Sequence, residues 1–224
     1  MSHAKVLFSL DILEILKITE TFHSLQGEGP LTGIPMYFVR TNGCNLRCSW
    51  CDSKYTFSGG TEIELESILA GVGNAWERWI CFTGGEPLIQ REAEAFVKGV
   101  VEMGKNVLIE TSGSISVERF VKYPGTVIDM DIKTPSSGES GSLFERNLTF
   151  LRNSDYVKFV IENSSDYEFA KDFLKRIPRG VRSIFQPCYG TDVKWLAERI
   201  ISDRIDVALM TQLHKQIWGE IQGV

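Results

Sequence analysis

Three cysteines lie close together in the first quarter of the chain, at positions 44, 48 and 51. Their spacing, C-x3-C-x2-C, places Cys44, Cys48 and Cys51 on one short loop directly after a predicted strand. Cysteine thiolates bind iron–sulfur clusters, and an electron-carrying cluster takes four protein ligands. Three thiolates on one loop can each bind one iron of a [4Fe–4S] cluster and leave the fourth iron open. The spacing therefore favours a cluster that binds a small molecule at its open iron.

Two other uses of this loop remain open from the residues alone. A zinc site would need a further ligand, for which Cys81, Cys188 and His23 are the candidates. Structural zinc sites usually draw their ligands from two pairs of residues, and no second pair follows the loop. A closed cluster would need one of the same two cysteines as its fourth thiolate. A disulfide framework is disfavoured, because the chain has an odd number of cysteines, five.

The elements that must position this loop can be predicted from the alternation of β-branched runs with amphipathic stretches. The predicted strands are 17–22, 36–40, 79–83, 106–110, 127–132, 156–161, 183–185 and 207–209. The predicted helices are 62–70, 90–103, 117–123, 166–177 and 193–201. Such alternation indicates right-handed strand–helix–strand units and a parallel sheet.

Polar residues and glycines gather in the loops that follow these strands. The loops are 42–53, 84–87, 111–114, 133–138, 186–189 and 211–214. In parallel α/β folds, whether the sheet is open or a barrel, loops at the carboxyl ends of the strands build the site. We therefore expect these loops to meet at one rim. The length of 224 residues fits one domain over 1–224.

Composition and charge exclude several classes of function. The formal net charge of -5 and the pI near 5.4 argue against a nucleic-acid partner, which usually needs a basic stripe. No apolar run approaches the roughly 20 residues of a membrane span, so no membrane partner is expected. The N-terminus lacks the pattern of a signal peptide, and a cytoplasmic location is expected. A small-molecule substrate suits this balance best.

Two motifs together resemble the radical S-adenosylmethionine superfamily. The first is the C-x3-C-x2-C run with an aromatic residue, Trp50, before the last cysteine. The second is Gly84-Gly85-Glu86-Pro87 after the predicted strand 79–83, where glycines permit close approach of the backbone. The resemblance implies that the cluster binds and cleaves S-adenosylmethionine.

Further segments resemble one family within it, the 7-carboxy-7-deazaguanine synthases. They are Phe22-His23-Ser24-Leu25-Gln26-Gly27-Glu28-Gly29, Phe38-Val39-Arg40-Thr41-Asn42-Gly43-Cys44, Cys51-Asp52-Ser53, Glu110-Thr111-Ser112-Gly113, Asp131-Ile132-Lys133-Thr134-Pro135-Ser136-Ser137-Gly138, Gln186-Pro187 and Gln212-Leu213-His214-Lys215. They span most of the chain. The resemblance implies an α/β fold, namely an abbreviated, partial (β/α) barrel with mostly parallel strands and the site at their carboxyl ends.

The family resemblance also implies a reaction. The substrate is 6-carboxy-5,6,7,8-tetrahydropterin, and the products are 7-carboxy-7-deazaguanine and ammonia. The reduced cluster cleaves S-adenosylmethionine to a 5′-deoxyadenosyl radical, which removes hydrogen from C6. The ring then contracts and S-adenosylmethionine is regenerated, so the enzyme is a carbon–nitrogen lyase. The product serves queuosine or archaeosine biosynthesis for tRNA modification. Implied partners are a flavodoxin- or ferredoxin-type one-electron reductant and a second copy of the chain in a homodimer.

Residues for the pterin follow from its chemistry and from the family. Arg40 suits the carboxylate, because a guanidinium can make a paired hydrogen bond; its alternative is a surface cation at a strand end. Gln26 and Glu28 could bind the aminopyrimidine edge or could form a polar turn. The family resemblance implies further substrate contacts from residues Leu25–Gly27 and from Thr83. His214 is either a substrate contact or a structural histidine.

The resemblance also carries a cofactor site. The residues expected at S-adenosylmethionine are Trp50, Cys51, Asp52, Gly84, Gly85, Glu86, Ser112, Asp131, Ile132, Lys133, Gln186, Pro187, Cys188 and Tyr189. Ser112 has a competing interpretation, because a helix beginning at Ser114 would need an N-cap nearby. Lys133 either contacts the methionyl carboxylate or closes a loop.

Magnesium is expected as well. Family members bind Mg²⁺ through substrate oxygen and a hydroxyl that commonly belongs to threonine. This chain has Ser53 at that position, and the hard oxygen that Mg²⁺ prefers is retained. Two rival functions remain: an activating enzyme that makes a glycyl radical on a partner protein, and a zinc-binding adaptor without catalysis.

Overall fold

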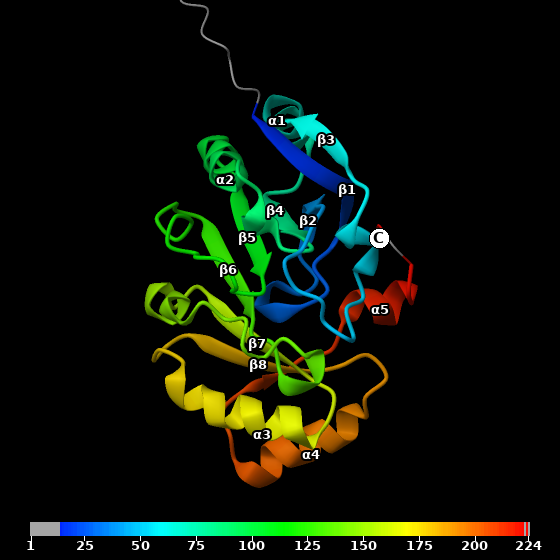
Figure 1. The fold of residues 1–224 in the computed structure, drawn as a ribbon, viewed down its shortest axis with the longest axis vertical. Coiled ribbons are helices and arrows are strands. Elements are labelled where there is room, and N and C mark those ends of the chain that lie inside the picture. The colour runs from blue at the N-terminus through cyan, green and yellow to red at the C-terminus, as the bar shows by residue number, and fades with distance from the viewer. Residues whose placement is uncertain (1–13, 222, 224) are drawn as a thin grey trace, which may run out of the picture.

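The computed structural model describes residues 14–221 and 223, which form a curved α/β layer structure (Figure 1). The described strands build a 9-stranded sheet in the order β3-β1-β2-β4-β5-β6-β7-β8-β9. Their bounds are β1 Ile15–Leu25, β2 Pro35–Thr41, β3 Thr61–Glu64, β4 Trp79–Gly84, β5 Asn106–Thr111, β6 Thr126–Asp131, β7 Tyr156–Ile161, β8 Arg182–Pro187 and β9 Ala208–Leu209. From β4 onward the strand order follows the chain, as repeated right-handed crossovers require.

The sheet is mostly parallel and does not close. β1 pairs antiparallel with both β2 and β3, whereas every pair from β2–β4 to β8–β9 is parallel. Because β3 and β9 end the described sheet without pairing with each other, the barrel is partial. The expectation of a partial barrel with mostly parallel strands is confirmed.

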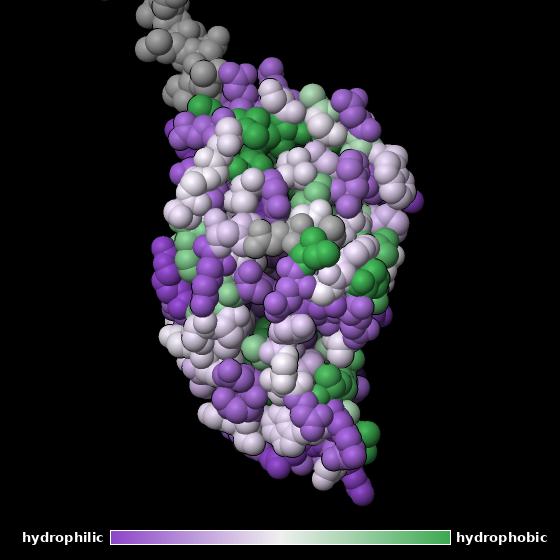
Figure 2. Space-filling view, turned by 90° about the vertical axis from the view of Figure 1, so that its right-hand side faces the viewer, coloured by the Kyte–Doolittle hydropathy of each residue, from purple (hydrophilic) through white to green (hydrophobic). Residues whose placement is uncertain are grey.

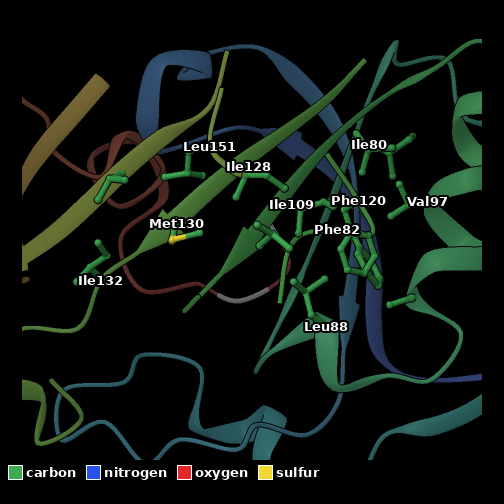
Figure 3. Packing of buried hydrophobic residues seen from close by; sticks show 14 of the residues in the cluster. Ile80, Phe82, Leu88, Val97, Ile109, Phe120, Ile128, Met130, Ile132 and Leu151 are labelled. Atoms are coloured by element: carbon green, nitrogen blue, oxygen red, sulfur yellow. The ribbon is translucent and has the colours of Figure 1, made fainter. Parts of the chain in front are cut away.

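Four helices cover the outer face of this sheet. They are α1 Leu65–Asn74, α2 Ala93–Glu102, α3 Ser164–Phe173 and α4 Val193–Asp203. Their apolar faces pack on outward-pointing residues of the strands in the main core, where Ile80, Phe82 and Ile109 meet Val97 (Figure 3). Alternation along each strand therefore sends one set of side chains to the helices and the other set inward.

The inner face is apolar at its base and polar toward the carboxyl ends of the strands. Met36, Phe38, Cys81, Leu108 and Tyr156 form a second, smaller apolar cluster inside the curve of the sheet. Later inward-pointing positions on the same strands are polar or charged. The last helix, α5 Leu213–Trp218, lies on this inner side, away from α1 to α4 (Figure 1).

The structure corrects three of the predicted elements. Residues 61–64 form strand β3, so α1 begins at Leu65 and not at position 62. The predicted helix 117–123 is a set of turns that Pro124 follows, with Phe120 buried in the core. Residues 213–218, of which the first two were predicted to belong to a loop, form helix α5. No helix of residues 14–221 is long and apolar enough to cross a membrane.

Candidate active site

One cavity opens at the carboxyl ends of the strands and is lined by residues from all six predicted loops. Cys44, Cys48 and Cys51 all line it, on the segment that follows β2. Burial raises the pKa of each thiol, and that of Cys48 to about 11. Figure 2 shows the molecule from the side of Figure 1 on which α5 lies, with hydrophilic residues around separate hydrophobic patches.

The cysteine loop is held in place by the loop after β6. Ser49 Oγ donates to the carbonyl oxygen of Ser136 at 2.6 Å, and the Ser49 amide donates to the Ser137 carbonyl oxygen at 3.0 Å. Trp50 Nε1 donates to Ser136 Oγ at 3.0 Å, and the ammonium of Lys133 lies 5.2 Å from the Trp50 ring centroid. Trp50 is thereby fixed as part of the cavity wall.

The Gly84-Gly85 turn brings the end of β4 against the cysteine loop. Gly84 has φ of +146°, and a Cβ there would lie 2.5 Å from the backbone oxygen of Thr41. A Cβ on Gly85 would lie 2.7 Å from the Cβ of Cys44. Glycine is required at both positions, because any side chain would push the two loops apart.

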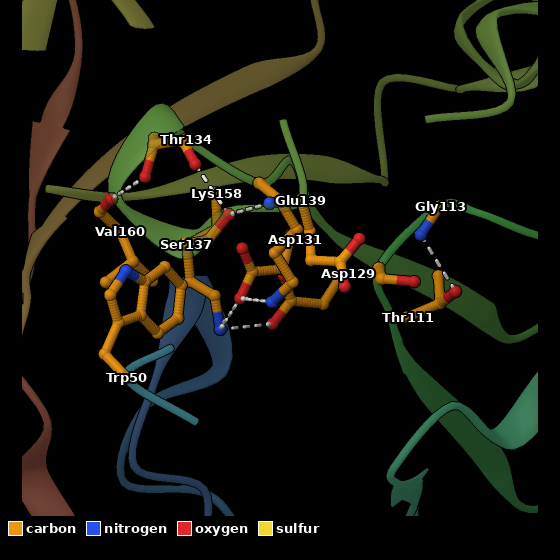
Figure 4. A network of polar contacts seen from close by, with 12 residues as sticks. Trp50, Thr111, Gly113, Asp129, Asp131, Thr134, Ser137, Glu139, Lys158 and Val160 are labelled. Atoms are coloured by element: carbon orange, nitrogen blue, oxygen red, sulfur yellow. Dashed lines mark hydrogen bonds and ion pairs between the residues drawn. The ribbon is translucent and has the colours of Figure 1, made fainter. Parts of the chain in front are cut away.

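A charged cluster lies at β6 and β7 around the buried ammonium of Lys158 (Figure 4). This ammonium pairs with a carboxylate oxygen of Glu28 and lies 3.7 Å from Asp129 Oδ2 and 3.8 Å from Asp131 Oδ2. Burial acts to raise the pKa of Glu28, but Lys158 and a hydrogen bond from Gln212 lower it to about 2. Burial raises the pKa of Asp129 to about 8, despite Lys158. Asp131 also pairs with the ammonium of Lys133 at 3.1 Å, so two ammonium groups lie among three carboxyl groups.

Helix α5 closes one side of the cavity by docking on the segment after β1. The Leu213 amide donates to the carbonyl oxygen of Gly27 at 2.9 Å, and Gln212 Nε2 donates to Glu28 Oε1 at 2.7 Å. The ring of His214 packs so closely on Gly27 that a Cβ there would lie 1.9 Å from its Nδ1. His214 therefore lines the cavity because Gly27 leaves room for it.

Arg40 extends from β2 into the cavity and is fixed by one carboxylate. Its Nε donates to Glu20 Oε1 at 2.8 Å, and the hydroxyl of Tyr55 donates to the same oxygen at 2.9 Å. Burial raises the pKa of Tyr55 to about 12, so the hydroxyl keeps the proton that it donates. The guanidinium carbon also lies 5.6 Å from the centroid of the Phe22 ring.

Comparison with known proteins decides the family. The model of the Radical SAM superfamily matches residues 38–180. A 7-carboxy-7-deazaguanine synthase of Thermoplasma acidophilum is 53% identical over 207 residues, which cover 92% of this chain and 99% of the relative. A synthase of the same name from Koribacter versatilis is 42% identical over 93% of this chain and 100% of the relative. The chain belongs to the 7-carboxy-7-deazaguanine synthase family of radical S-adenosylmethionine enzymes.

Solved structures agree on the fold. QueE from Escherichia coli matches with a TM-score of 0.75 at 24% identity, over 89% of this chain and 95% of that protein. SuiB from Streptococcus suis bound to its precursor peptide SuiA matches with a TM-score of 0.57 at 12% identity, over 78% of this chain and 47% of that one. At identities this low, the two comparisons support a shared fold and nothing further. Both solved proteins thus share the fold of this chain over most of its length.

The donor set suits the groups that the family implies. Within residues 14–221 and 223, no three His, Cys, Asp or Glu side chains converge closely enough to hold a single metal ion. Three thiols spread along one cavity wall suit a cluster, whose irons take one thiolate each. Asp131 Oδ1 and Gln186 Oε1 are buried and accept no hydrogen bond from described residues, although both side chains line the cavity. Such atoms are ready to accept hydrogen bonds from a bound ligand.

Nearly all of the predicted site residues line this one cavity. Those expected at the substrate are Leu25, Gln26, Gly27, Glu28, Arg40, Thr83 and His214. Those expected at the cofactors are Cys44, Cys48, Trp50, Cys51, Asp52, Ser53, Gly84, Gly85, Ser112, Asp131, Lys133, Gln186, Pro187, Cys188 and Tyr189. Their roles remain predictions, although their convergence is a geometric fact.

Two predicted cofactor residues point elsewhere. Ile132 lies in the outer core, and Glu86 is buried with its carboxylate accepting hydrogen bonds from Thr111 Oγ1 at 2.8 Å and Ser112 Oγ at 2.6 Å. Glu86 thus ties the ends of β4 and β5 together. Ser112 caps no helix, because residues 117–123 form turns. The alternative zinc ligand His23 faces away from the cavity and bonds to Glu77 Oε1 at 2.6 Å.

Sequence reasoning missed the charged residues that lie within strands. Asp129, Glu110 and Lys158 occupy inward positions of β6, β5 and β7, and both acids line the cavity. The available signal was a charge inside an otherwise apolar strand. A buried strand position tolerates a charge when a partner compensates it, so such a residue indicates a partner across the sheet.

Proposed function

We propose that this chain is a carbon–nitrogen lyase that converts 6-carboxy-5,6,7,8-tetrahydropterin to 7-carboxy-7-deazaguanine and ammonia, for deazapurine biosynthesis such as that of queuosine or archaeosine. One observation carries the proposal: a cavity with three cysteines on one wall also contains a fixed arginine and a polar floor. Full-length similarity to synthases of 7-carboxy-7-deazaguanine supports it. We place residues 1–224 in a single domain.

The cysteine loop and its neighbours would hold the cofactors. Cys44, Cys48 and Cys51 would bind a [4Fe–4S] cluster, and S-adenosylmethionine would lie along Trp50, Gly85, the β6 loop and the β8 loop. When bound, the cluster and S-adenosylmethionine together supply the means to remove hydrogen from C6 of the substrate. The chain itself orients the two partners and excludes water.

The polar side chains fix the pterin. The terminal nitrogens of Arg40 donate no hydrogen bond to a described residue, so they are available for a carboxylate. Glu28 has each carboxylate oxygen paired, with Lys158 and with Gln212. Each of these oxygens keeps a lone pair for a further hydrogen bond, so the aminopyrimidine edge would meet Glu28 together with Gln26, Thr83 and His214.

A magnesium ion would complete the site. Ser53 Oγ donates to Asp52 Oδ1 at 2.9 Å, and both side chains line the cavity beside the last cysteine. We place Mg²⁺ at Ser53, where it would join the substrate to the protein. The enzyme would draw electrons from a flavodoxin or ferredoxin, act as a homodimer and reside in the cytoplasm.

The test is an anaerobic assay of the reconstituted protein with the carboxylated tetrahydropterin, S-adenosylmethionine, Mg²⁺ and a reductant. Liquid chromatography with mass detection should show 7-carboxy-7-deazaguanine, and an ammonia assay should give an equal amount of ammonia. Absence of both products from protein with a full cluster would reject the proposed reaction.

A further inference from the structure

An irregularity in β1 determines which side chains face the substrate cavity. β1 pairs with β2 in one register at Ile18 and Thr41 and in another, shifted by one residue, from Glu20 and Arg40 onward. Thr19 is therefore the extra residue of a β-bulge. A bulge of this kind re-aims the side chains that follow it.

The burial on either side of the bulge shows this change of face. Leu16 and Ile18 point outward into the core beneath the helices. Phe22, at the same parity along the strand, instead packs inside the barrel and stacks on Phe38, with ring centroids 4.8 Å apart. Without the bulge, Glu20 would follow Ile18 into the apolar outer core, where an unpaired carboxylate is costly. With the bulge, Glu20 lies directly opposite Arg40 on the cavity side.

The carboxylate of Glu20 joins the arginine to the cysteine loop. Oε1 accepts from Arg40 Nε at 2.8 Å and from the Tyr55 hydroxyl at 2.9 Å. Tyr55 belongs to the 3-10 helix Lys54–Phe57, which begins directly after Ser53. Only Nε of the guanidinium is used in this contact among the described residues, so the two terminal nitrogens stay available at the cavity.

We propose that Tyr55 and Glu20 are positioning residues that orient Arg40 for the substrate carboxylate. This inference rests on the proposed function, in which Arg40 binds that carboxylate. Tyr55 and Arg40 donate to the same oxygen of Glu20, so Tyr55 fixes the acceptor of the Arg40 hydrogen bond. The guanidinium cannot then turn about its Cδ–Nε bond without breaking a charge-assisted hydrogen bond. The same two hydrogen bonds link Arg40, where the substrate carboxylate would bind, to the segment that follows the cysteine loop. The rate of reaction depends on how closely the bound groups are aligned.

The test compares two unreactive ligands on the reconstituted holoenzyme with S-adenosylmethionine and Mg²⁺ bound. The ligands are 6-carboxypterin and pterin, which differ by the carboxylate, and their dissociation constants are measured by anaerobic equilibrium dialysis. Tyr55→Phe should raise the dissociation constant of 6-carboxypterin about three- to tenfold, which corresponds to the loss of one hydrogen bond. It should leave pterin unchanged, and that unchanged value also reports that the variant is folded.

Tyr37→Phe is the matched control. Tyr37 lies on the same strand as Arg40 but points outward, with its ring 4.9 Å from that of His23. This change should alter the affinity for neither ligand. If Tyr37→Phe lowered the affinity for 6-carboxypterin as much as Tyr55→Phe does, the inference would be overturned. The loss would then not depend on the contact between Tyr55 and Glu20.

A double-mutant cycle tests whether Tyr55 acts through Arg40. In the Arg40→Gln background, Tyr55→Phe should cause no further loss of affinity for 6-carboxypterin, because the guanidinium that Tyr55 helps to orient is gone. Additive losses would overturn the inference, as would a Tyr55→Phe loss shared by pterin. A parent enzyme that turns over the carboxylated tetrahydropterin but binds both ligands equally would overturn the positioning role alone. Failure of turnover in the parent would instead reject the proposed function.

Discussion

The three cysteines predicted to bind the cluster differ from Cys81 in where their thiols lie. Cys44, Cys48 and Cys51 line the cavity, whereas Cys81 is fully buried among the strands beside Gln26. Cys188 also lines the cavity, on the opposite loop, and is the one other described thiol that a bound cluster could meet. The identity of the cluster ligands can therefore be tested one residue at a time.

Anaerobic reconstitution should load about four irons per parent chain. Alanine at Cys44, Cys48 or Cys51 should prevent this loading, because each thiolate would bind one iron. Cys188→Ala is the matched control and should retain the full iron content, measured by iron analysis and by the visible absorbance of the cluster. Loss of iron in the control would mean a fourth protein ligand and no open iron.

Ser53 carries the magnesium prediction. Ser53→Ala should raise the Mg²⁺ concentration that gives half of the maximal rate, whereas Ser53→Thr should cause little change, because threonine keeps the hydroxyl. Initial rates measured over a range of Mg²⁺ concentrations test this. An unchanged Mg²⁺ response in Ser53→Ala would show that its oxygen is not a ligand.

Asp129 should make stability depend on pH in a defined direction. Its pKa is raised by burial from 3.8 to about 8, with Glu110, Glu28 and Asp131 adding to the rise and Lys158 opposing it. Between these values the folded protein holds a proton that the unfolded chain releases. This contribution to the free energy of unfolding therefore falls as pH rises through that window and levels off above it.

Asp129→Asn should remove this dependence, because the amide does not titrate. Between about pH 5.5 and about pH 7.5, the parent should lose on the order of 2–3 kcal/mol more stability than the variant. Urea unfolding at both pH values measures the difference. The low pKa of Glu28, about 2, affects stability only in more acidic solution, so it does not obscure the comparison. Equal slopes in the two proteins would mean that Asp129 is ionised in the folded state.

At the scale of the elements, the sequence predicted the parallel strands well. The predicted strand 156–161 has the observed bounds of β7, and the other strand predictions overlap β1, β2, β4, β5, β6, β8 and β9. Most of these strands are buried on both faces, by the outer core and by the inner cluster, so they appear as continuous runs of β-branched and aromatic residues. The site loops could be placed from sequence for the same reason, since each follows such a strand.

The elements that were missed depend on tertiary contacts. β3 consists of Thr61–Glu64, a polar edge segment whose strand structure comes from pairing with β1. Helix α5 contains six residues and no buried one, so its sequence has no amphipathic signal; it forms where Leu213 and His214 dock on Gly27. The bulge at Thr19 could not be predicted from sequence either, because it is defined by the change in register between β1 and β2 on either side of Thr19.

Docking of α5 on Gly27 should fail when a methyl group is added there. Gly27→Ala should displace His214, and the amides of α5 should exchange with solvent at least about tenfold faster. Gly73→Ala is the control, because Gly73 lies in α1 and a Cβ there would meet no neighbouring atom. Alanine favours the helix over glycine by about 1 kcal/mol. Hydrogen exchange with mass spectrometry measures both variants. Unchanged exchange in Gly27→Ala would show that this contact does not hold the helix.

At the scale of the whole molecule, the partial barrel joins two chemically different walls around one substrate. The cysteine loop and the ends of β6 and β8 form the wall expected to hold the cofactors, while β1, β2 and α5 provide the wall expected to hold the pterin. Lys158 and its carboxyl groups form the floor between them. The open sheet leaves this site accessible at the carboxyl ends of the strands, as in other parallel α/β enzymes.

A labelling experiment distinguishes contraction of the pterin ring without net oxidation from other radical reactions at this site. Ring contraction with ammonia release needs no net electrons, so S-adenosylmethionine should be recovered after each turnover. The substrate is supplied with deuterium at C6, and the product and recovered S-adenosylmethionine are analysed by mass spectrometry. We expect many turnovers per S-adenosylmethionine, with deuterium in the recovered cofactor. Stoichiometric 5′-deoxyadenosine, with no deuterium in recovered S-adenosylmethionine, would contradict it.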